Sequence, residues 1–280
     1  MRYIKICICG GRNFIKIHSF FKSPISEIKF DFIRNQKYFR QLFKCKFCKH
    51  ILSTHKINDQ KLYYGDYSKS NYQKNILQTF LKINSLPIYK SDNYWRVKNI
   101  EKFAKNWFKD LFLTSKQKPS ILDVGSGLCI FLNKVKKKLG WNCTALEIDK
   151  LLSKHSKLTL NIKTLNTDFL KMYTKKKFDI ITFNKVIEHV KNPIAFIIRA
   201  NELLKINGFL YIEVPDAECA AQDKCGYQRE EFTIDHPHVF SSTSLSIAIT
   251  KSNMKLISLQ RIVEPSGKYT LRAFAARNNY

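Results

Sequence analysis

From residue 120 onward, short apolar segments alternate with segments of helical apolar spacing, and this alternation restricts the fold more than any other feature. The apolar segments have the length of buried strands and fall at 121–124, 143–147, 162–165, 178–183 and 209–214. Leu128 to Leu139 is spaced as a helix that Gly140 ends, and Asn192-Pro193 is typical of the start of a helix, which we expect Gly208 to end. Two more strands are expected at 255–263 and 268–275. We therefore predict an α/β fold with a doubly wound, mostly parallel sheet of seven strands.

The chain divides into three regions by composition. Residues 1–57 carry two close cysteine pairs, residues 58–118 are expected to form helical connectors on the substrate side, and residues 119–280 hold the alternating strands and helices. A polar run that ends at Pro119 marks the last boundary. The connector at 215–241 is long for a link between a strand and a helix, and it therefore predicts a lid or a substrate insert.

A glycine turn follows the first of these strands, in the run Asp123-Val124-Gly125-Ser126-Gly127. Glycine has no Cβ, so a ligand can approach the backbone of such a turn closely. The spacing is not the G-x-G-x-x-G of dinucleotide sites, and no P-loop lysine follows. The turn therefore favours a ligand other than a nucleotide phosphate.

Acidic residues stand at the ends of the first three strands, at Asp123, Glu147 and Asp168. A carboxylate about 20 residues beyond the glycines, as at Glu147, can accept ribose hydroxyls. Asp168 can reach an adenine amino group, and Asp123 can meet an ammonium group. Three solvated carboxylates at loop starts are the alternative, but their combination with the glycines favours a nucleoside with a positively charged tail.

These runs and three further segments resemble the class I S-adenosylmethionine-dependent methyltransferases, over residues 120–275. The further segments are Ala145-Leu146-Glu147-Ile148-Asp149, Glu188-His189-Val190-Lys191-Asn192-Pro193 and Gly208-Phe209-Leu210-Tyr211-Ile212-Glu213-Val214-Pro215. The resemblance implies a Rossmann-like fold, methyltransferase activity and S-adenosylmethionine as the cofactor.

The resemblance also implies a role for individual residues of the cofactor site. Asp123, Gly125 and Gly127 would hold the methionine portion. Glu147 would bind the ribose, Asp168 the adenine edge, and Asn184 would lie beside the sulfonium. Cys129 stands where the family usually has its third glycine, a departure that can weaken cofactor binding.

The cysteines of the N-terminal region form two close pairs, Cys7 with Cys9 and Cys45 with Cys48. Two such pairs on either side of a loop predict a tetrahedral structural zinc site, which would stabilise a region too small to build its own core. The first pair is one residue shorter than the usual C-x-x-C. His50 is an alternative fourth ligand, and four ordinary thiols are the other alternative.

A subgroup of bacterial class I methyltransferases is similar over the whole chain. Its members join a zinc-ribbon-like cysteine module and tyrosine-rich helices, here residues 62–67, to a methyltransferase core, and residues 235–245 also resemble them. The subgroup is associated with modified sugars and surface polysaccharides. This similarity implies a small-molecule or carbohydrate-type methyl acceptor.

Three histidines are candidate catalytic bases for acceptors that must lose a proton: His189, His236 and His238. An unperturbed histidine pKa of about 6.5 suits this role. The alternative is a structural role for His189 and simple surface exposure for His236 and His238. Small-RNA 2′-O-methyltransferases hold Mg²⁺ with a similar motif, but Lys185 stands at one of their ligand positions, so we expect no metal at the active site.

The net charge of +27 comes from 49 Lys and Arg against 22 Asp and Glu, and 39 of the 49 are lysine. Nucleic-acid readers favour arginine, so we interpret the charge as a lysine bias of the whole chain. No run approaches the about 18 apolar residues of a membrane helix, and we expect a cytoplasmic enzyme. An RNA methyltransferase that docks RNA on its basic N-terminal module, and an inactive interaction protein, are the alternatives.

Overall fold

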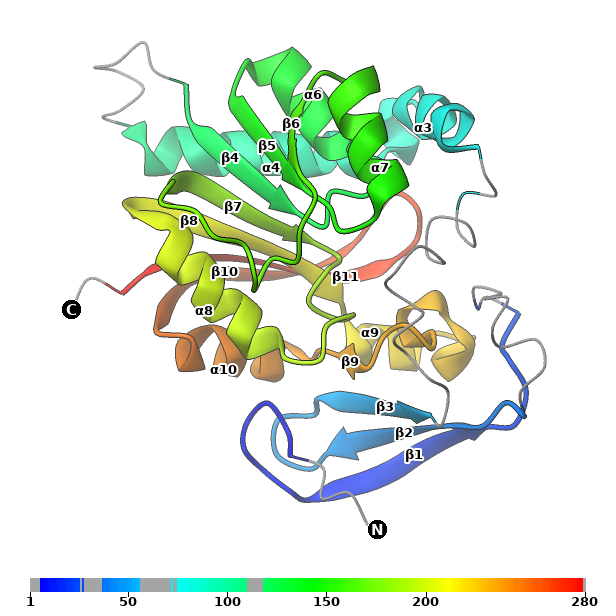
Figure 1. Cartoon of the computed structure of the whole chain (residues 1–280). Helices are drawn as coiled ribbons and strands as arrows, with labels where there is room; N and C mark the ends of the chain where they lie inside the picture. The colour runs from blue at the N-terminus through cyan, green and yellow to red at the C-terminus, as the bar shows by residue number, and fades with distance from the viewer. Residues whose placement is uncertain are drawn as a thin grey trace.

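Seven strands form the central sheet of the computed structural model, in the order β10-β11-β8-β7-β4-β5-β6 (Figure 1). The structure describes residues 6–25, 27, 37–55, 72, 75–109 and 118–278, so the tyrosine-rich segment 62–67 lies outside the described residues. The strands of this sheet are β4 (Ser120–Val124), β5 (Asn142–Leu146), β6 (Lys163–Leu165), β7 (Phe178–Asn184), β8 (Leu204–Pro215), β10 (Met254–Val263) and β11 (Tyr269–Arg277). The five strands from β8 to β6 pair in parallel, and β11 runs antiparallel to both β8 and β10. The predicted doubly wound, mostly parallel sheet is confirmed.

Helices cover both faces of the sheet. One face carries α3 (Ile76–Asn84), α4 (Asp92–Trp107), α6 (Ile130–Leu139) and α7 (Lys150–Lys154), and the other carries α8 (Pro193–Leu203) and α10 (Ser242–Lys251) (Figure 1). Adjacent strand residues point to opposite faces: Ile121 packs with the α4 and α6 side, whereas Leu122 packs with the α8 and α10 side. Strands buried on both faces explain the continuous apolar runs of the sequence.

The predicted helix boundaries agree with the structure at two positions and disagree at a third. Asn192 caps α8, with its side chain accepting a hydrogen bond from the amide of Ala195, and Gly140 at φ +66° ends α6. The expectation that α8 continues to Gly208 was wrong, because β8 already begins at Leu204. Gly208 instead permits close strand packing, since a Cβ there would lie 2.9 Å from the carbonyl oxygen of Asp179 on β7.

The N-terminal region forms a second sheet, with β1 (Phe14–Phe20), β2 (Arg40–Cys45) and β3 (Ile51–His55) in antiparallel order. A fourth strand, β9 (His238–Val239), comes from the predicted lid and pairs with β3. The rest of the lid contains α9 (Ala217–Gln222) and the short 3₁₀ turns η4 (Gly226–Gln228) and η5 (Glu230–Phe232). A further 3₁₀ turn, η2 (Ile88–Lys90), precedes α4, and a π-helical turn, η3 (His155–Thr159), follows α7. The cysteine-rich region therefore shares a sheet with the connector 215–241.

A buried ion network attaches α4 to the sheet. Arg96 on α4 donates to Glu213 on β8 at 2.7 Å and lies 3.3 Å from a carboxylate oxygen of Glu264. Two further cations complete the network: Arg272 lies 2.9 Å from Glu213, and Lys185 lies 3.1 Å from Glu264. Burial raises the pKa of Glu213, but the charges of Arg96, Arg272 and Lys185 together outweigh this effect and lower that pKa.

We expect Arg96→Ala to lower the free energy of unfolding by about 3 kcal/mol, because it leaves buried carboxylates short of a cation. Urea denaturation followed by circular dichroism measures the change. Lys105→Ala on the same helix is the control, since Lys105 is 65% exposed beside Glu101 and should contribute less than about 1 kcal/mol. Equal effects of the two substitutions would contradict a structural role for the network.

Candidate active site and cysteine cluster

A cavity of about 1090 Å³ opens at the carboxyl ends of β4, β5 and β7. In open α/β sheets, ligands bind where the strand order reverses, and here β4 pairs with β5 on one side and β7 on the other. All six residues predicted to bind the cofactor line the cavity: Asp123, Gly125, Gly127, Glu147, Asp168 and Asn184. Of the predicted bases, His189 and His236 line it, while His238 is not among its lining residues.

Asp123 ends β4 as a buried carboxylate held by its neighbours. One of its oxygens accepts hydrogen bonds from Thr182 Oγ1 at 2.5 Å and from Asn184 Nδ2 at 2.7 Å. Burial raises the pKa of Asp123 to about 6. The amide oxygen of Asn184 is buried with no hydrogen-bond partner among the described residues. Thr182 was missed by the sequence reasoning, because nothing marks it within an apolar strand.

The turn after β4 keeps a left-handed backbone at three positions. Gly125 and Gly127 have φ angles of +65° and +52°. A Cβ at Gly125 would lie 3.0 Å from a methyl carbon of Val186. Cys129, in place of the family's third glycine, also has a positive φ, +59°, and caps α6 with its backbone. A side chain in this region costs on the order of 1–3 kcal/mol, so the cysteine keeps the glycine conformation at some cost.

Glu147 connects the glycine turn to the end of β5. Its carboxylate accepts hydrogen bonds from the amides of Gly127, at 2.7 Å, and Asp149, at 2.9 Å. Burial raises the pKa of Glu147 to about 7. Asp168, which is only partly buried, accepts a hydrogen bond from the amide of Leu170 at 2.8 Å. Glu147 therefore shapes the turn as well as lining the cavity.

Two histidines that line the same cavity, His189 and His236, have ring centroids 4.6 Å apart. His189 Nδ1 donates to the carbonyl oxygen of Asp235 at 2.7 Å and lies 3.5 Å from its carboxylate. His236 Nδ1 donates to the carbonyl oxygen of Glu231 at 2.9 Å. Burial lowers the pKa of His236 to about 4. Against the effect of burial, His236 and His189 lower the pKa of Asp235, which keeps this carboxylate ionised.

Glu188 lies beside these histidines as a fully buried carboxylate. Apart from its own backbone amide, it has no hydrogen-bond partner among the described residues. Ligand atoms of Glu188, His189 and His236 lie within 4.8 Å of one another, a spacing that can hold a metal ion. The expectation of no metal rested on the charge of Lys185. The structure pairs that charge with Glu264 at 3.1 Å, so the argument from Lys185 no longer holds.

His238 lies between the N-terminal region and the core. Its Nδ1 is 3.0 Å from Nε2 of His50, and it is part of β9. Burial lowers the pKa of His238 to about 4. The sequence could not separate His238 from His236, because only the pairing of β9 with β3 turns the two rings to different surroundings.

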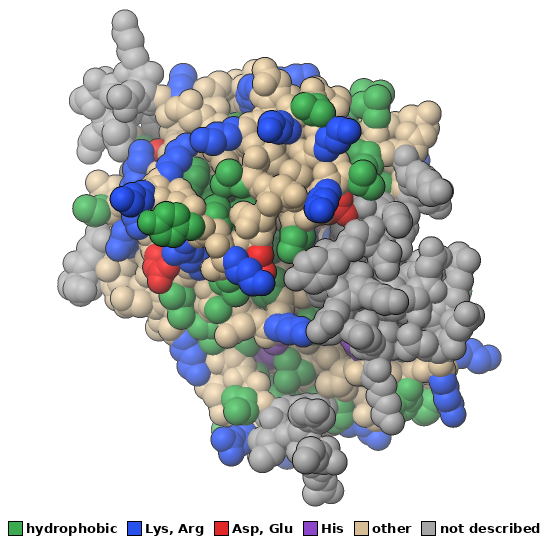
Figure 2. All heavy atoms as spheres, viewed as in Figure 1, with side chains coloured by type: hydrophobic (Ala, Val, Ile, Leu, Met, Phe, Trp, Pro, Cys, Tyr) green, Lys and Arg blue, Asp and Glu red, His purple; other side chains and the backbone are tan. Residues whose placement is uncertain are grey.

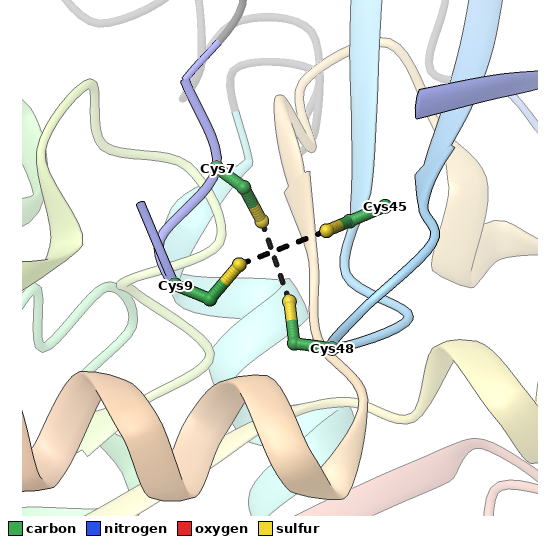
Figure 3. Close-up of side chains that lie close together, drawn as sticks. All are labelled: Cys7, Cys9, Cys45 and Cys48. Atoms are coloured by element: carbon green, nitrogen blue, oxygen red, sulfur yellow. Dashed lines mark hydrogen bonds between the residues drawn. The ribbon is translucent and has the colours of Figure 1, made fainter. Parts of the chain in front are cut away.

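The four predicted cysteines converge on one point (Figure 3). The sulfur of Cys7 lies 3.3 Å from that of Cys48, and the sulfur of Cys9 lies 3.7 Å from that of Cys45. These are not disulfides, and tetrahedral zinc with Zn–S bonds of about 2.3 Å would set its sulfurs about 3.8 Å apart. The amide of Gly11 points at the Cys9 sulfur at 3.4 Å. The cluster can therefore hold a metal ion.

The other predicted ligand, His50, is not part of this cluster. Its Nδ1 is 3.2 Å from Ser244 Oγ, and its Nε2 bonds to His238. Within the cluster, the hydrogen bond from Cys7 lowers the pKa of Cys48 to about 5, while the reciprocal contact raises the pKa of Cys7. Cys48 thus favours the thiolate, which is the form that binds metal, whereas Cys7 and Cys9 favour the thiol.

The glycine turn at 125–127 and the acids Asp123, Glu147 and Asp168 together form what we call the turn–acid cradle. The sheet order and this cradle define a class I, S-adenosylmethionine-dependent methyltransferase. A family described as "Methyltransferase domain" matches residues 95–259, and the chain belongs to this family. None of the helices in the described part of the chain is long and apolar enough to span a membrane.

Known proteins agree with this assignment. Ubiquinone biosynthesis O-methyltransferase from Pelagibacter ubique is 32% identical over 124 residues, which are 40% of this chain and 50% of that protein. The chain spans about half the length of the curated relatives it matches. Streptomyces venezuelae DesVI has a similar fold, at TM-score 0.52 and 14% identity over 74% of this chain and 98% of its own. Synechocystis magnesium protoporphyrin IX methyltransferase with bound S-adenosylmethionine has TM-score 0.52 and 12% identity, covering 80% and 100%.

We expect Gly125→Ala to weaken S-adenosylhomocysteine binding about tenfold, or about 1.4 kcal/mol, because its Cβ would meet Val186 from a left-handed backbone. Cys129→Gly is the matched change. It should alter affinity by less than about threefold, since the backbone already has the glycine conformation. Isothermal titration calorimetry measures both. A tenfold gain in Cys129→Gly would show instead that the cysteine side chain obstructs the cofactor.

Proposed function

We propose that this protein transfers a methyl group from S-adenosylmethionine to a hydroxyl group of a small-molecule or sugar acceptor. The observation that carries the proposal is that one cavity is lined both by the glycine turn with the acids Asp123, Glu147 and Asp168 and by the His189–Asp235 pair. The curated relatives in the comparison are named O-methyltransferases, which supports oxygen as the acceptor atom.

In the proposed complex, the buried acids and the glycine turn hold the cofactor. Asp123 faces its ammonium group, Glu147 its ribose and Asp168 its adenine edge, while the buried amide oxygen of Asn184 lies beside the sulfonium. S-adenosylmethionine supplies a methyl group already activated by its sulfur. The task left to the chain is to align the acceptor and remove its proton.

We assign the base role to His189. Its Nδ1 donates to Asp235, so the neutral ring presents Nε2 as the proton acceptor. As the acceptor oxygen bonds to the methyl carbon, the carbon–sulfur electron pair stays on sulfur and the hydroxyl proton moves to His189. The ionised Asp235, 3.5 Å away, stabilises the resulting imidazolium. His236, with its lowered pKa, stays neutral and lines the acceptor end.

Cofactor affinity should depend on pH through Asp123. Its pKa of about 6 exceeds the usual value because of burial, and a cofactor ammonium favours the ionised form. Affinity for S-adenosylhomocysteine should therefore rise about tenfold from pH 5 to pH 7.5 through this group alone. In Asp123→Asn, the affinity for S-adenosylhomocysteine should fall. The tenfold rise in affinity between pH 5 and pH 7.5 that comes from Asp123 should also disappear. An affinity in the native protein that stays constant over this range would remove Asp123 from the ammonium site.

The acceptor class can be tested with methyl-labelled S-adenosylmethionine and fractionated cell extract. We expect label in a low-molecular-weight or sugar-containing fraction, with His189→Gln reducing transfer at least about tenfold while binding S-adenosylhomocysteine normally. Label that ribonuclease releases would show an RNA methyltransferase instead. Cofactor binding without any transfer would favour the inactive interaction protein.

Lysine and arginine occur at several places on the face shown in Figure 2, interspersed with other side chains, rather than in one patch.

We further propose that Cys7, Cys9, Cys45 and Cys48 hold a structural zinc ion. The sulfur separations, the amide of Gly11 and the burial of three of the four thiols support this assignment. Elemental analysis of the full chain should find about one zinc bound at this cluster, and Cys45→Ser should lose it. Retention of that zinc in Cys45→Ser would remove the cluster as its site.

A further inference from the structure

We propose that the cysteine module, residues 6–25 and 37–55, is the scaffold that holds the acceptor side of the cavity in place. The element it holds is segment 226–241, which carries Asp235 and His236. This inference rests on the proposed function only where it names this side of the cavity the acceptor side. The contacts between the module and the segment do not depend on that function.

The first connection is the strand pair β3–β9. Ile51 pairs with Val239 and Leu52 with His238, and the amide of Ser53 donates to the carbonyl oxygen of Pro237 at 3.0 Å. Among the described strands, β3 is the only one that forms a ladder with β9. A two-residue strand cannot keep its position alone, so the module supplies the template for this part of the segment.

The second connection reaches the metal-binding loop itself. The hydroxyl of Ser241 donates to the carbonyl oxygen of Cys48. Two residues further on, His50 is fully buried between Ser244 and His238, at 3.2 and 3.0 Å. The carbonyl oxygen of His50 also accepts from the amide of Cys45 at 2.8 Å, which closes the loop between the two cysteines. The geometry of the cluster therefore sets the position of His50 and, through it, of His238.

The third connection is Arg40, a fully buried side chain on β2. Its guanidinium donates to the carbonyl oxygen of Phe232 in the segment, to Glu27 at 3.1 Å and to the hydroxyl of Tyr38 at 2.9 Å. Apolar side chains of the module pack with Phe232 and Val239 around these polar contacts: Phe20, Leu42 and Ile51. The module thus contacts the segment at Phe232 in its middle and at residues 237–241 at its end.

The opposite side of segment 226–241 faces the cavity. The carbonyl oxygen of Asp235 accepts from His189, and the amide of His238 donates to the carbonyl oxygen of Glu188 at 3.3 Å. The cofactor side is built differently, because Asp123 and Glu147 are held by Thr182, Asn184 and backbone amides of the main sheet and its loops. Loss of the module should therefore loosen the acceptor side and leave the cofactor side intact.

The experiment compares full-length Cys45→Ser with the native protein by hydrogen–deuterium exchange. We expect exchange in segment 226–241 to become at least tenfold faster, while residues 120–147 and the dissociation constant of S-adenosylhomocysteine change less than threefold. Cys225→Ser is the control, since Cys225 is an exposed thiol beside the same segment and outside the cluster. Unchanged protection of segment 226–241 after metal loss would overturn the proposal.

Arg40→Met is a second test of the proposal, which can be used if Cys45→Ser does not fold. It keeps all four cysteines, so the metal content should stay native while exchange in segment 226–241 rises at least tenfold. Native protection there in a metal-loaded Arg40→Met protein would refute the scaffold role. Failure of the native protein to bind S-adenosylhomocysteine would instead refute the proposed function, and the exchange comparison would still decide the inference.

Discussion

The parallel pairing of β4 with β5 on one side and β7 on the other is the constraint on which the site depends. Chain connections leave the sheet in opposite directions at this point, so the carboxyl ends of β4 and β7 are left uncovered. Asp123 and Asn184 end these two strands and meet at 2.7 Å. The glycine turn follows directly, and Glu147 from the end of β5 accepts a hydrogen bond from Gly127. One topological feature thus assembles the cofactor cradle from residues that are far apart in the sequence.

The acceptor end follows a different principle, because segment 215–241 lies outside the main sheet except at its start. It contacts the histidine loop after β7, the cysteine-rich sheet and β11, where the amide of Tyr269 donates to Glu231 at 2.8 Å. Buried polar groups at this junction have their partners across it: Arg40 donates to Phe232 of the segment, and His50 contacts His238 of the segment and Ser244 of α10. The N-terminal region is therefore bonded directly to a segment that lines the cavity.

Much of the fold, and the grouping of the candidate cofactor residues around one cavity, could be predicted from the sequence, because the signals are local. Apolar runs, the Asn192 cap and the Gly125–Gly127 turn each act within a few residues. The errors occurred where distant segments decide the conformation. Residues 204–207 are strand because β7 offers a neighbour, and Gly208 serves a close approach to Asp179. Thr182 is similar: its hydroxyl has a role only because β7 lies beside Asp123.

The sequence by itself determined the α/β class, the acidic strand ends, the cysteine pairs and the candidate histidines, since residue type and spacing encode each of them. Only the tertiary structure decided which of these residues meet. It placed His189 and His236 in the cavity and His238 against His50, turned Lys185 toward Glu264, and joined β9 to β3. The physical reason is that pairing between strands far apart in sequence depends on the packing of the whole chain, for which no local pattern exists.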